Sequence, residues 1–486
     1  MKLKRLYIPD YFILKGFEIQ FQNKLSLVIG ENGSGKSSLI EVLAYIFGHL
    51  HKYFILNDKT AEFIDGYEIE YEISYNETLY TVFIGSKYVD QVSNTFKPTI
   101  KINNEVYSIS QIDKTFGGMQ NFLPTKVILF YSGITNHLFE LSEHFRKKYR
   151  SRLIQKNNNY SLNPLVLPND NPFCYIQSDY LPLIILSLLL DKEKSFNLLQ
   201  NKLGIDIDGL DISIICKEPS WHKDRNKKKK DVPNQHPWGI EGTVSQEIFD
   251  RLVQNSLSQN YDDEHNELTL EYLGAIMVND IFADIEITPQ IAFMLLDVLL
   301  CSDLIKSIDI SWINEGNKIY LDRLSEGQKQ LIMTWGTSLV WEQDKLLFLF
   351  DEPDISLHPK WQRDFISDLN NCLKDSCAVV STHSPLMLGN ANNSDIFILE
   401  EGKWVKNTAK YYGKDNDVVL FEFMGVTKRI NSITVRIDAL FKAIEDEDIE
   451  LSEKIYSELL EILGPNDSDL VQARMQIDYL KDDSFE

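Results

Sequence analysis

The sequence LSLVIGENGSGKSSLIEVL, residues Leu25–Leu43, decides the fold of this chain. Its apolar run up to Ile29 is typical of a buried strand, and apolar side chains return at helical spacing from Leu39. Between them, Gly30–Ser37 matches G-x-x-x-x-G-K-[ST], a pattern whose glycines let backbone N–H groups and a helix N-terminus face an anion. A glycine-rich turn that only caps the helix is the alternative. Because a strand precedes the loop and a helix follows it, we favour a phosphate-binding loop.

Each position of this loop has an expected role. Lys36 would reach the β and γ phosphates of a nucleotide, and the Ser37 hydroxyl would complete a Mg²⁺ site. The expected nucleotide-binding residues are Gly30, Glu31, Asn32, Gly33, Ser34, Gly35, Lys36, Ser37 and Ser38.

A second apolar run, Leu346–Phe350, is closed by two carboxylates, Asp351 and Glu352. A strand that is apolar on both faces belongs in the middle of a covered parallel sheet, and such sheets bind ligands at the carboxyl ends of their strands. Asp351 suits Mg²⁺, and Glu352 suits activation of an attacking water. A solvated pair that caps a helix would explain the charges but not the neighbouring motifs.

Two shorter motifs accompany the acidic strand. LSEGQKQ, residues Leu324–Gln330, begins a predicted helix just upstream, and alone it would be a common type of helix start. His383 follows the apolar strand Ala378–Val380 in STHSP. A lone histidine is more often structural than catalytic, but this one is predicted at the same sheet edge as the two acids.

The composition is that of an ordinary folded chain. It has 486 residues, 43% hydrophobic and 25% charged, which excludes wholesale disorder and predicts roughly two to four structural units. The longest apolar run, Leu181–Leu190, contains a proline and favours a buried helix, and we expect neither a membrane partner nor a signal peptide. Five cysteines without a C-x-x-C pair predict no disulfide framework and a cytoplasmic location. The net charge of −23 argues against a chain coated with nucleic acid.

Changes in pattern divide the chain into four expected parts. Residues 1–136 hold the phosphate loop and a predicted antiparallel sheet, because apolar and polar residues alternate from Phe63 to about Ile112. Residues 137–320 are expected to form a mainly helical insert, and residues 321–412 hold the three later motifs. Residues 413–486 are expected to form an acidic helical domain, with 15 Asp or Glu against 5 Lys or Arg from Asn431 onward.

The insert has two basic segments that could contact DNA by following a phosphate backbone. A solvated basic helix face is the favoured alternative for both. The residues concerned are Arg146, Lys147, Lys148, Arg150 and Arg152, with Tyr149 among them, and the loop Lys227–Lys230.

The four motifs, in this order, resemble those of ABC-type ATPases, in the soluble SMC-like and OLD-like branch. GENGSGKS is similar to the family's Walker A motif, LSEGQ to its signature, LFLFDEPDISLHP to its Walker B motif and D-loop, and STHSP to its switch-histidine strand. The resemblance covers about half of the chain. It implies an α/β P-loop head, with a parallel sheet and an antiparallel β subdomain, joined to a helical insert and a helical C-terminal domain, and it implies ATP and Mg²⁺ as cofactors.

The resemblance also implies roles for single residues. Lys36, Glu352 and His383 would be catalytic, with His383 at the γ-phosphate, and Ser37 and Asp351 would hold the metal. Two heads would close head to tail over two ATP molecules and build a homo-oligomer from dimers.

Three further residues would act between the two heads. Ser325 and Gly327 would contact the γ-phosphate of the other protomer's ATP, and Asp354 would lie in the D-loop at the dimer seam. The position that is usually a second glycine in the signature is Glu326. No glutamine follows the predicted strand in Lys126–Gly133, so the glutamine loop is unassigned, and Gln111 or Gln120 would serve only with a different strand count.

The C-terminal region gives a narrower resemblance. YYGKDNDVVLFEFMGV, from Tyr411, and a predicted helix pair after it resemble the end of PtuA-type ATPases of Septu and retron anti-phage defence systems. This implies a sensor and scaffold that gates a separate, PtuB-like HNH nuclease, with a retron reverse transcriptase and its DNA as further partners. No H-N-H or H-E-x-x-H constellation is present, and no Toprim-like D-x-D follows an apolar strand after His383. The run Asp446–Asp448 lies inside a predicted acidic helix, where a solvated face is favoured, so we expect the cutting residues on another chain.

Two other functions stay open at this point. A DNA repair or maintenance ATPase would clamp DNA ends without a dedicated nuclease, and an autonomous RNA-cleaving toxin would hide its active site in the insert. An adjacent gene for an HNH nuclease or a reverse transcriptase would separate these alternatives from the defence function.

Overall fold

The computed structural model describes residues 1–58, 66–86, 98–133, 137–155, 171–225, 237–274, 281, 287–342, 345–392, 395–405 and 431–483. It divides into two compact units, Met1–Tyr412 and Gly413–Glu486. Each unit is described by itself.

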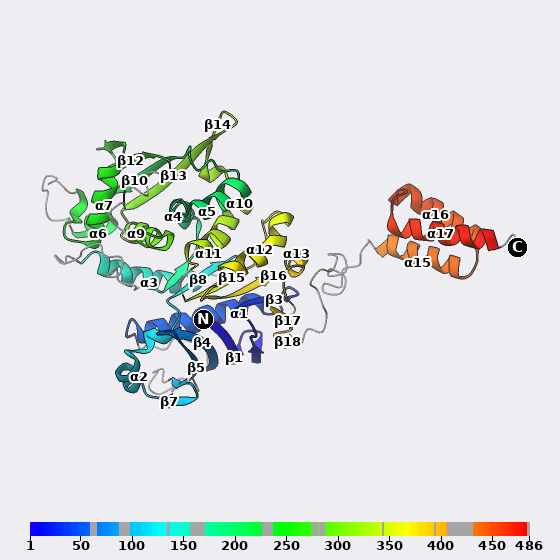
Figure 1. The fold of residues 1–486 in the computed structure, drawn as a ribbon, viewed down its shortest axis with the longest axis horizontal. Coiled ribbons are helices and arrows are strands. Elements are labelled where there is room, and N and C mark those ends of the chain that lie inside the picture. Colours follow the sequence, from blue (N-terminus) through cyan, green and yellow to red (C-terminus); the bar gives the residue numbers. More distant parts are fainter. Residues whose placement is uncertain are drawn as a thin grey trace. The chain divides into compact units, whose positions relative to one another are not determined.

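A seven-stranded sheet forms the centre of the first unit (Figure 1). Its order is β18-β17-β3-β16-β15-β8-β9, and every neighbouring pair is parallel except β17 and β18. The strands are β3 (Leu25–Gly30), β8 (Lys126–Tyr131), β9 (Phe173–Tyr175), β15 (Leu346–Asp351), β16 (Cys377–Thr382), β17 (Ile396–Glu400) and β18 (Lys403–Val405).

The burial of the middle strands explains why their sequences are almost continuously apolar. Every residue of β3, β15 and β16 is buried, as expected for parallel strands covered on both faces. Since β16 lies between β3 and β15, the phosphate loop and the acidic pair reach the same sheet edge, one strand apart. The predicted α/β head is confirmed.

A six-stranded antiparallel sheet packs against the first sheet through one helix. Its order is β2-β1-β4-β5-β6-β7. The helix α1 (Lys36–Phe54) lies between the two sheets, and its buried side chains form one hydrophobic core with residues of both (Figure 1). The strands are β1 (Lys2–Tyr11), β2 (Leu14–Gln20), β4 (Tyr67–Tyr75), β5 (Thr78–Ser86), β6 (Thr99–Ile102) and β7 (Glu105–Tyr107), followed by α2 (Ile109–Phe116). Since α1 starts at Lys36, this packing fixes the direction of the phosphate loop.

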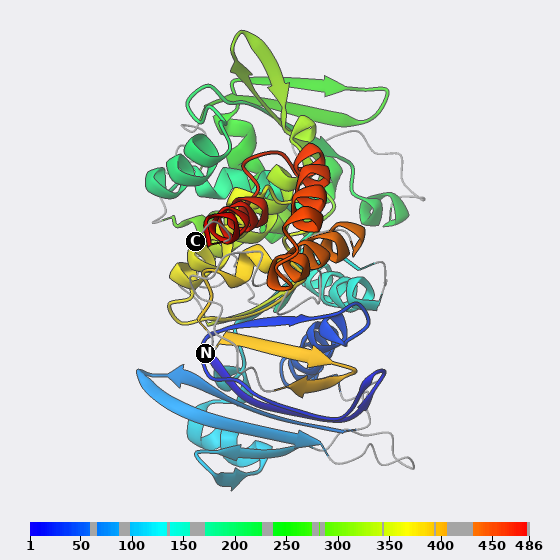
Figure 2. The same cartoon turned by 90° about the vertical axis from the view of Figure 1, so that its right-hand side faces the viewer.

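Besides its helices, the insert contains a second antiparallel sheet that the sequence analysis did not predict. The helices are α3 (His137–Leu153), α4 (Leu181–Leu188), α5 (Lys192–Ser195), α6 (Ser220–Arg225), α7 (Val244–Asn255) and α9 (Pro289–Cys301). The sheet has the order β11-β12-β10-β13-β14 and is seen from its side in Figure 2. Its strands are β10 (Asp211–Lys217), β11 (Ser258–Asp262), β12 (Glu267–Leu273), β13 (Ile305–Asn314) and β14 (Asn317–Tyr320). The prediction of a mainly helical insert is therefore incomplete, because it left out this sheet.

The later motifs lie on short helices around the main sheet. The signature begins α10 (Glu326–Leu331), which continues through a π-helical turn, Ile332–Gly336, into α11 (Thr337–Val340). α12 (Pro359–Cys372) follows the acidic strand, and α13 (Pro385–Leu388) follows the histidine. Within the described part of the chain, no helix is long and apolar enough to cross a membrane.

In the second unit, the described residues 431–483 form a bundle of three helices, where the sequence analysis predicted a helix pair. They are α15 (Asn431–Glu445), α16 (Ile449–Leu463) and α17 (Ser468–Asp483). Gly464 and Pro465 separate the last two, since Gly464 has a positive φ of 79° and proline cannot continue a helix. The bundle has its own core, which includes Leu440, Leu459 and Ile477.

Candidate active site

The phosphate loop is held tightly from its outer side. A Cβ added at Gly30 would lie 2.3 Å from the Leu399 carbonyl oxygen, so β17 leaves no room for a side chain. The Gly402 N–H donates to the Ser34 carbonyl oxygen (3.0 Å) and fixes the loop to the turn after β17. Gly33 and Gly35 have positive φ values of 80° and 107°, which glycine adopts at little cost. The pattern of glycines therefore has a local structural cause at each position.

Two observations on the loop fit a phosphate ligand. The Ser34 hydroxyl is buried and has no hydrogen-bond partner in the described chain. Lys36 is only 4% exposed, and its Nζ donates to the loop's own carbonyl oxygens, Gly30 and Glu31 (3.1 Å each). Burial lowers the Lys36 pKa, opposed by the charges of Glu352 and Asp351. A phosphate would supply an acceptor for the Ser34 hydroxyl. It would also replace the backbone carbonyl oxygens as the acceptor for Lys36.

Asp351 lies at the end of β15 and faces the loop. Its carboxylate accepts from the Ser381 hydroxyl (2.5 Å) and from the hydroxyl of Ser37. The Ser132 hydroxyl, after β8, is 3.4 Å from its second oxygen. Burial raises the Asp351 pKa, and the hydrogen bonds from Ser381 and Ser37 oppose that shift. The two predicted metal residues, Ser37 and Asp351, are thus in contact, and their oxygens are the ligands that Mg²⁺ prefers.

Glu352 and His383 form the second half of the site. The Glu352 backbone is left-handed, with φ 49°, an uncommon conformation for a residue other than glycine. Its N–H donates to the carbonyl and hydroxyl oxygens of Ser381 (3.1 and 3.0 Å), so β16 holds this turn. The His383 Nε2 lies 3.1 Å from Glu352 Oε1. Burial and the nearby Lys36 charge lower the His383 pKa, which favours the neutral ring at pH 7.

The D-loop after Glu352 is gripped by two glutamines that the sequence analysis did not single out. Gln330 of α10 donates to the Glu352 carbonyl oxygen and accepts from the Ser356 N–H, both at 3.2 Å. Gln362 of α12 donates to the carbonyl oxygens of Asp354 (3.1 Å) and Leu357 (2.9 Å). Gln330 is the last residue of the LSEGQKQ motif, but its contact with Glu352 depends on the fold and could not be seen from the motif.

Asp354 itself is buried in this chain. It is 6% exposed, one of its oxygens has no hydrogen-bond partner among the described residues, and burial raises its pKa to about 6, with the Thr382 hydroxyl opposing. A role at a dimer seam remains a prediction, and it would require this side chain to gain an outside partner.

The signature residues have a local role in addition to the one that the resemblance implies. Ser325 is exposed and caps α10, since its hydroxyl accepts from the Gln328 N–H (3.3 Å). Gly327 is buried, and a Cβ there would lie 2.2 Å from the Ser356 carbonyl oxygen. The start of the signature helix therefore packs directly on the D-loop backbone.

The sheet order also answers the question of the glutamine loop. β8 pairs with β15, and Tyr131 lies opposite Asp351, so Ser132 occupies the position nearest the acidic pair. Gln111 instead caps α2 with Ser108, and Gln120 donates to Gly117. Neither of the two glutamines considered from the sequence reaches the site.

The first basic segment is used inside the protein. Arg146 contacts Glu143 and Asp179, and Arg150 Nε donates to the Cys301 carbonyl oxygen (2.6 Å). Tyr149 is 4% exposed, so its ring is not available to stack on a base, whereas contact of the basic side chains with a phosphate backbone stays a prediction. The loop Lys227–Lys230 lies outside the described residues.

The strand order, the loop, the acidic strand end and the histidine together define a P-loop ATPase head of the ABC type. The chain belongs to the AAA ATPase domain family, whose model matches residues 1–388.

Curated relatives include two retron proteins. The chain is 26% identical over 190 residues to "Retron Ec83 probable ATPase" of Escherichia coli, which covers 37% of this chain and 34% of that protein. It is 32% identical over 123 residues to "Retron Vc95 probable ATPase" of Vibrio cholerae, 22% of this chain and 24% of that protein. The matches thus span about a third and a quarter of the relatives' lengths.

Solved structures of SMC heads are also similar. The SMC head domain from Thermotoga maritima aligns with 84% of this chain and all of that chain, at a TM-score of 0.32 and 14% identity. The SMC head bound to the C-terminal winged-helix domain of ScpA aligns at a TM-score of 0.35 and 12% identity, with 83% and 97% coverage. The fold is assigned here from the strand order and not from these alignments.

Proposed function

We propose that this chain is the ATP-binding and ATP-hydrolysing sensor and scaffold subunit of a bacterial anti-phage defence complex. In this proposal, ATP-dependent association of its heads gates a separate nuclease, of the HNH type. The observation that carries the ATPase part is the meeting of Lys36, Asp351, Glu352 and His383 at one sheet edge.

The residues divide the chemical work as follows. Lys36 and the loop N–H groups would hold the phosphates, and Ser37 with Asp351 would hold Mg²⁺, which supplies charge neutralisation when bound. Glu352 would accept the proton of the attacking water, because it is the less buried of the two acids. A neutral His383 has one ring N–H, which would donate either to that carboxylate, 3.1 Å from its Nε2, or to the transferred group once a nucleotide is bound.

A composite site explains how hydrolysis could gate a partner. Ser325 is exposed and belongs to a different lobe from the phosphate loop, so it is available to a second protomer. If the second head completes the site, ATP binding assembles the dimer and hydrolysis releases it. The names of the two retron relatives support a place in a defence system, and the anti-phage function, nuclease and head-to-tail dimer are proposals built on that likeness.

The C-terminal bundle supports a contact with a cationic protein. On α17, Leu470, Ala473 and Ile477 face the bundle core. Val471, Met475 and Tyr479 lie on the opposite face and are 40%, 69% and 66% exposed. A helix with two apolar faces, only one of them buried, suits a further protein contact. Because the segment from Asn431 carries 15 acidic and 5 basic residues, a basic nuclease surface fits better than a second copy of the bundle.

The test uses the full chain, co-expressed with the nuclease gene of its own locus. The purified chain alone should hydrolyse ATP and cut neither DNA nor RNA in Mg²⁺ or Mn²⁺. Truncation after Gly413 should keep nucleotide binding and release the nuclease. Replacing Val471, Met475 and Tyr479 together by Ser should also release it, whereas Val435→Ser with Leu451→Ser, exposed on the other two helices, should not.

Two results would contradict the proposal. Nuclease activity that copurifies with this chain alone, and disappears with a point mutation in the insert, would refute the scaffold role. Retention of the nuclease by the truncated chain would show that the bundle serves only the chain's own assembly.

A DNA repair or maintenance ATPase is the second candidate. The chain is 29% identical over 77 residues to "DNA repair protein RecN" of Aquifex aeolicus, 16% of this chain and 13% of that protein. ATP-dependent retention of DNA ends by the chain, without any nuclease partner, would favour this candidate.

A further inference from the structure

We propose that Gln330 is a positioning residue that couples the signature helix to the catalytic carboxylate of the same chain. The inference rests on the proposed ATPase function and adds a connection to it. No phosphate contact is assigned to Gln330, and its side chain lies behind the site.

The Gln330 side chain makes two hydrogen bonds among the described residues, both with the backbone around the D-loop. Its side-chain N–H donates to the Glu352 carbonyl oxygen and its Oε1 accepts from the Ser356 N–H, both at 3.2 Å. Gln330 is 7% exposed, and both bonds are partly buried, which strengthens them relative to bonds in water. An amide side chain is suited to this position, because one group must donate and accept within the same turn.

The turn that Gln330 holds contains a residue in an uncommon backbone conformation. Glu352 adopts φ 49°, and a non-glycine residue keeps such a conformation only when its surroundings enforce it. Ser381 holds the Glu352 N–H from β16, and Gln330 holds its carbonyl oxygen from α10. Together they fix the two peptide groups on either side of the carboxylate, and hence the direction of the side chain.

The helix that carries Gln330 can transmit a displacement to that turn. Gly327 leaves no space between the helix start and the Ser356 carbonyl oxygen, so the helix and the D-loop cannot slide independently. The exposed Ser325 begins the same helix, two residues before Gly327. A ligand that engages Ser325 would therefore move the Glu352 turn through Gln330.

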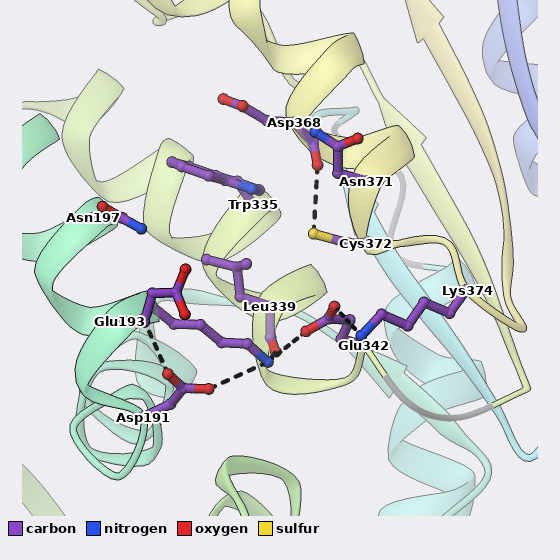
Figure 3. A pocket seen from close by; sticks show the side chains of 11 residues that line it. Asp191, Glu193, Asn197, Trp335, Leu339, Glu342, Asp368, Asn371, Cys372 and Lys374 are labelled. Carbon is purple, nitrogen blue, oxygen red and sulfur yellow. Dashed lines mark hydrogen bonds and ion pairs between the residues drawn. The ribbon is translucent and has the colours of Figure 1, made fainter.

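The far end of the helix is tied to the insert around a pocket of about 540 Å³ (Figure 3). There Lys194 Nζ lies 2.6 Å from the carboxylate of Glu342, which also contacts Lys374 (2.7 Å). The Lys202 ammonium lies 4.0 Å from the centre of the Trp335 ring, on the π-helical turn. The signature helix and its continuation thus contact the insert at one end and the Glu352 turn at the other. Gln330 makes the contact with that turn.

The first experiment compares Gln330→Met with the wild-type chain. Methionine keeps the volume and removes both hydrogen bonds. We expect the ATP dissociation constant to stay within about twofold and kcat to fall at least about tenfold, because only the placement of Glu352 changes. Gln111→Met is the matched control. The Gln111 side chain also hydrogen-bonds to backbone, at the start of α2, so this variant should leave the ATP dissociation constant and kcat unchanged.

The second experiment tests whether Gln330 acts within its own chain. A chain with both Lys36→Ala and Gln330→Met should still support hydrolysis by a wild-type protomer in a mixed dimer, as Lys36→Ala alone does, because the wild-type protomer supplies its own Gln330 and Glu352. A folding defect caused by Gln330→Met would lower the melting temperature of the double variant and the activity of its mixture alone, so the melting temperature is measured beside the rate.

The outcomes separate this inference from the proposed function. Normal kcat in Gln330→Met would overturn the coupling while leaving the ATPase function intact. So would loss of activity in the mixed dimer with the double variant only, at an unchanged melting temperature of that variant. A wild-type chain without ATPase activity would overturn the proposed function and this inference with it.

Discussion

Asp354 gives a quantitative test of the site in the nucleotide-free chain. Burial raises its pKa from 3.8 to about 6. The folded chain therefore holds the proton more tightly than the unfolded chain, and stability falls as the pH rises between these two values. At 1.36 kcal/mol per pKa unit, a difference of about two units costs about 3 kcal/mol at pH 7. Asp354→Asn removes the charge and keeps the shape, so it should raise the free energy of unfolding by about that amount.

The assay is urea unfolding of the full chain without nucleotide, at pH 7 and pH 5. By linkage, the advantage of Asp354→Asn should shrink to about half at pH 5, because part of the wild-type carboxylate is then protonated. Asp113→Asn, at an exposed position of α2, is the control and should change the free energy of unfolding by less than about 0.5 kcal/mol at either pH. A stabilisation that is absent at pH 7, or equal at both values, would refute the assignment of a charge-destabilised carboxylate at this position.

Two further predictions concern the loop and the signature. Lys36→Ala should abolish tight MgATP binding in a filter or fluorescence assay, because the loop loses its charged side chain, whereas Glu352→Gln should keep binding and accumulate dimers seen by light scattering. Equal ATPase rates for Glu352→Gln and the wild type would contradict the role of Glu352. Gly327→Ala should destabilise the chain by about 1–3 kcal/mol, since its Cβ would meet the Ser356 carbonyl oxygen at 2.2 Å. Gly389→Ala, whose Cβ would have 3.9 Å to its nearest neighbour, should be nearly neutral in the same thermal unfolding assay, and equal effects would be inconsistent with this packing.

The head was predictable because its motifs lie on strands buried on both faces. Such strands read as continuous apolar runs, and β3, β15 and β16 are buried at every residue. Each run ends at a residue of the site, so the order of motifs along the chain was enough to place Lys36, Asp351 and His383 at one edge.

The insert was less predictable because its strands lie between helices and two of them, β9 and β11, have no clear strand pattern. β13 alternates apolar and polar residues, but β11 is exposed at all five positions and shows no core-facing pattern. β9 has only three residues and pairs with β8, which lies far from it in the sequence. Their pairing depends on tertiary contacts that no local spacing encodes.

The glutamine contacts could not be predicted for a related reason. Gln330 and Glu352 are separated by 22 residues, and Gln362 follows on another helix. A motif indicates which residues face a ligand. Which residues hydrogen-bond to the D-loop backbone is decided by how α10 and α12 pack on the D-loop, and no motif encodes that packing.

Complementation between two inactive variants tests the central claim most directly. Ser325→Arg keeps its phosphate loop and loses its signature, and Lys36→Ala does the reverse. If the active site is shared between two chains, each variant alone should be inactive. An equal mixture should recover about a quarter of the wild-type rate, since half of the dimers would have one intact site. Full activity of Ser325→Arg alone, or no recovery in a mixture shown to form mixed dimers, would contradict a site completed by a second head.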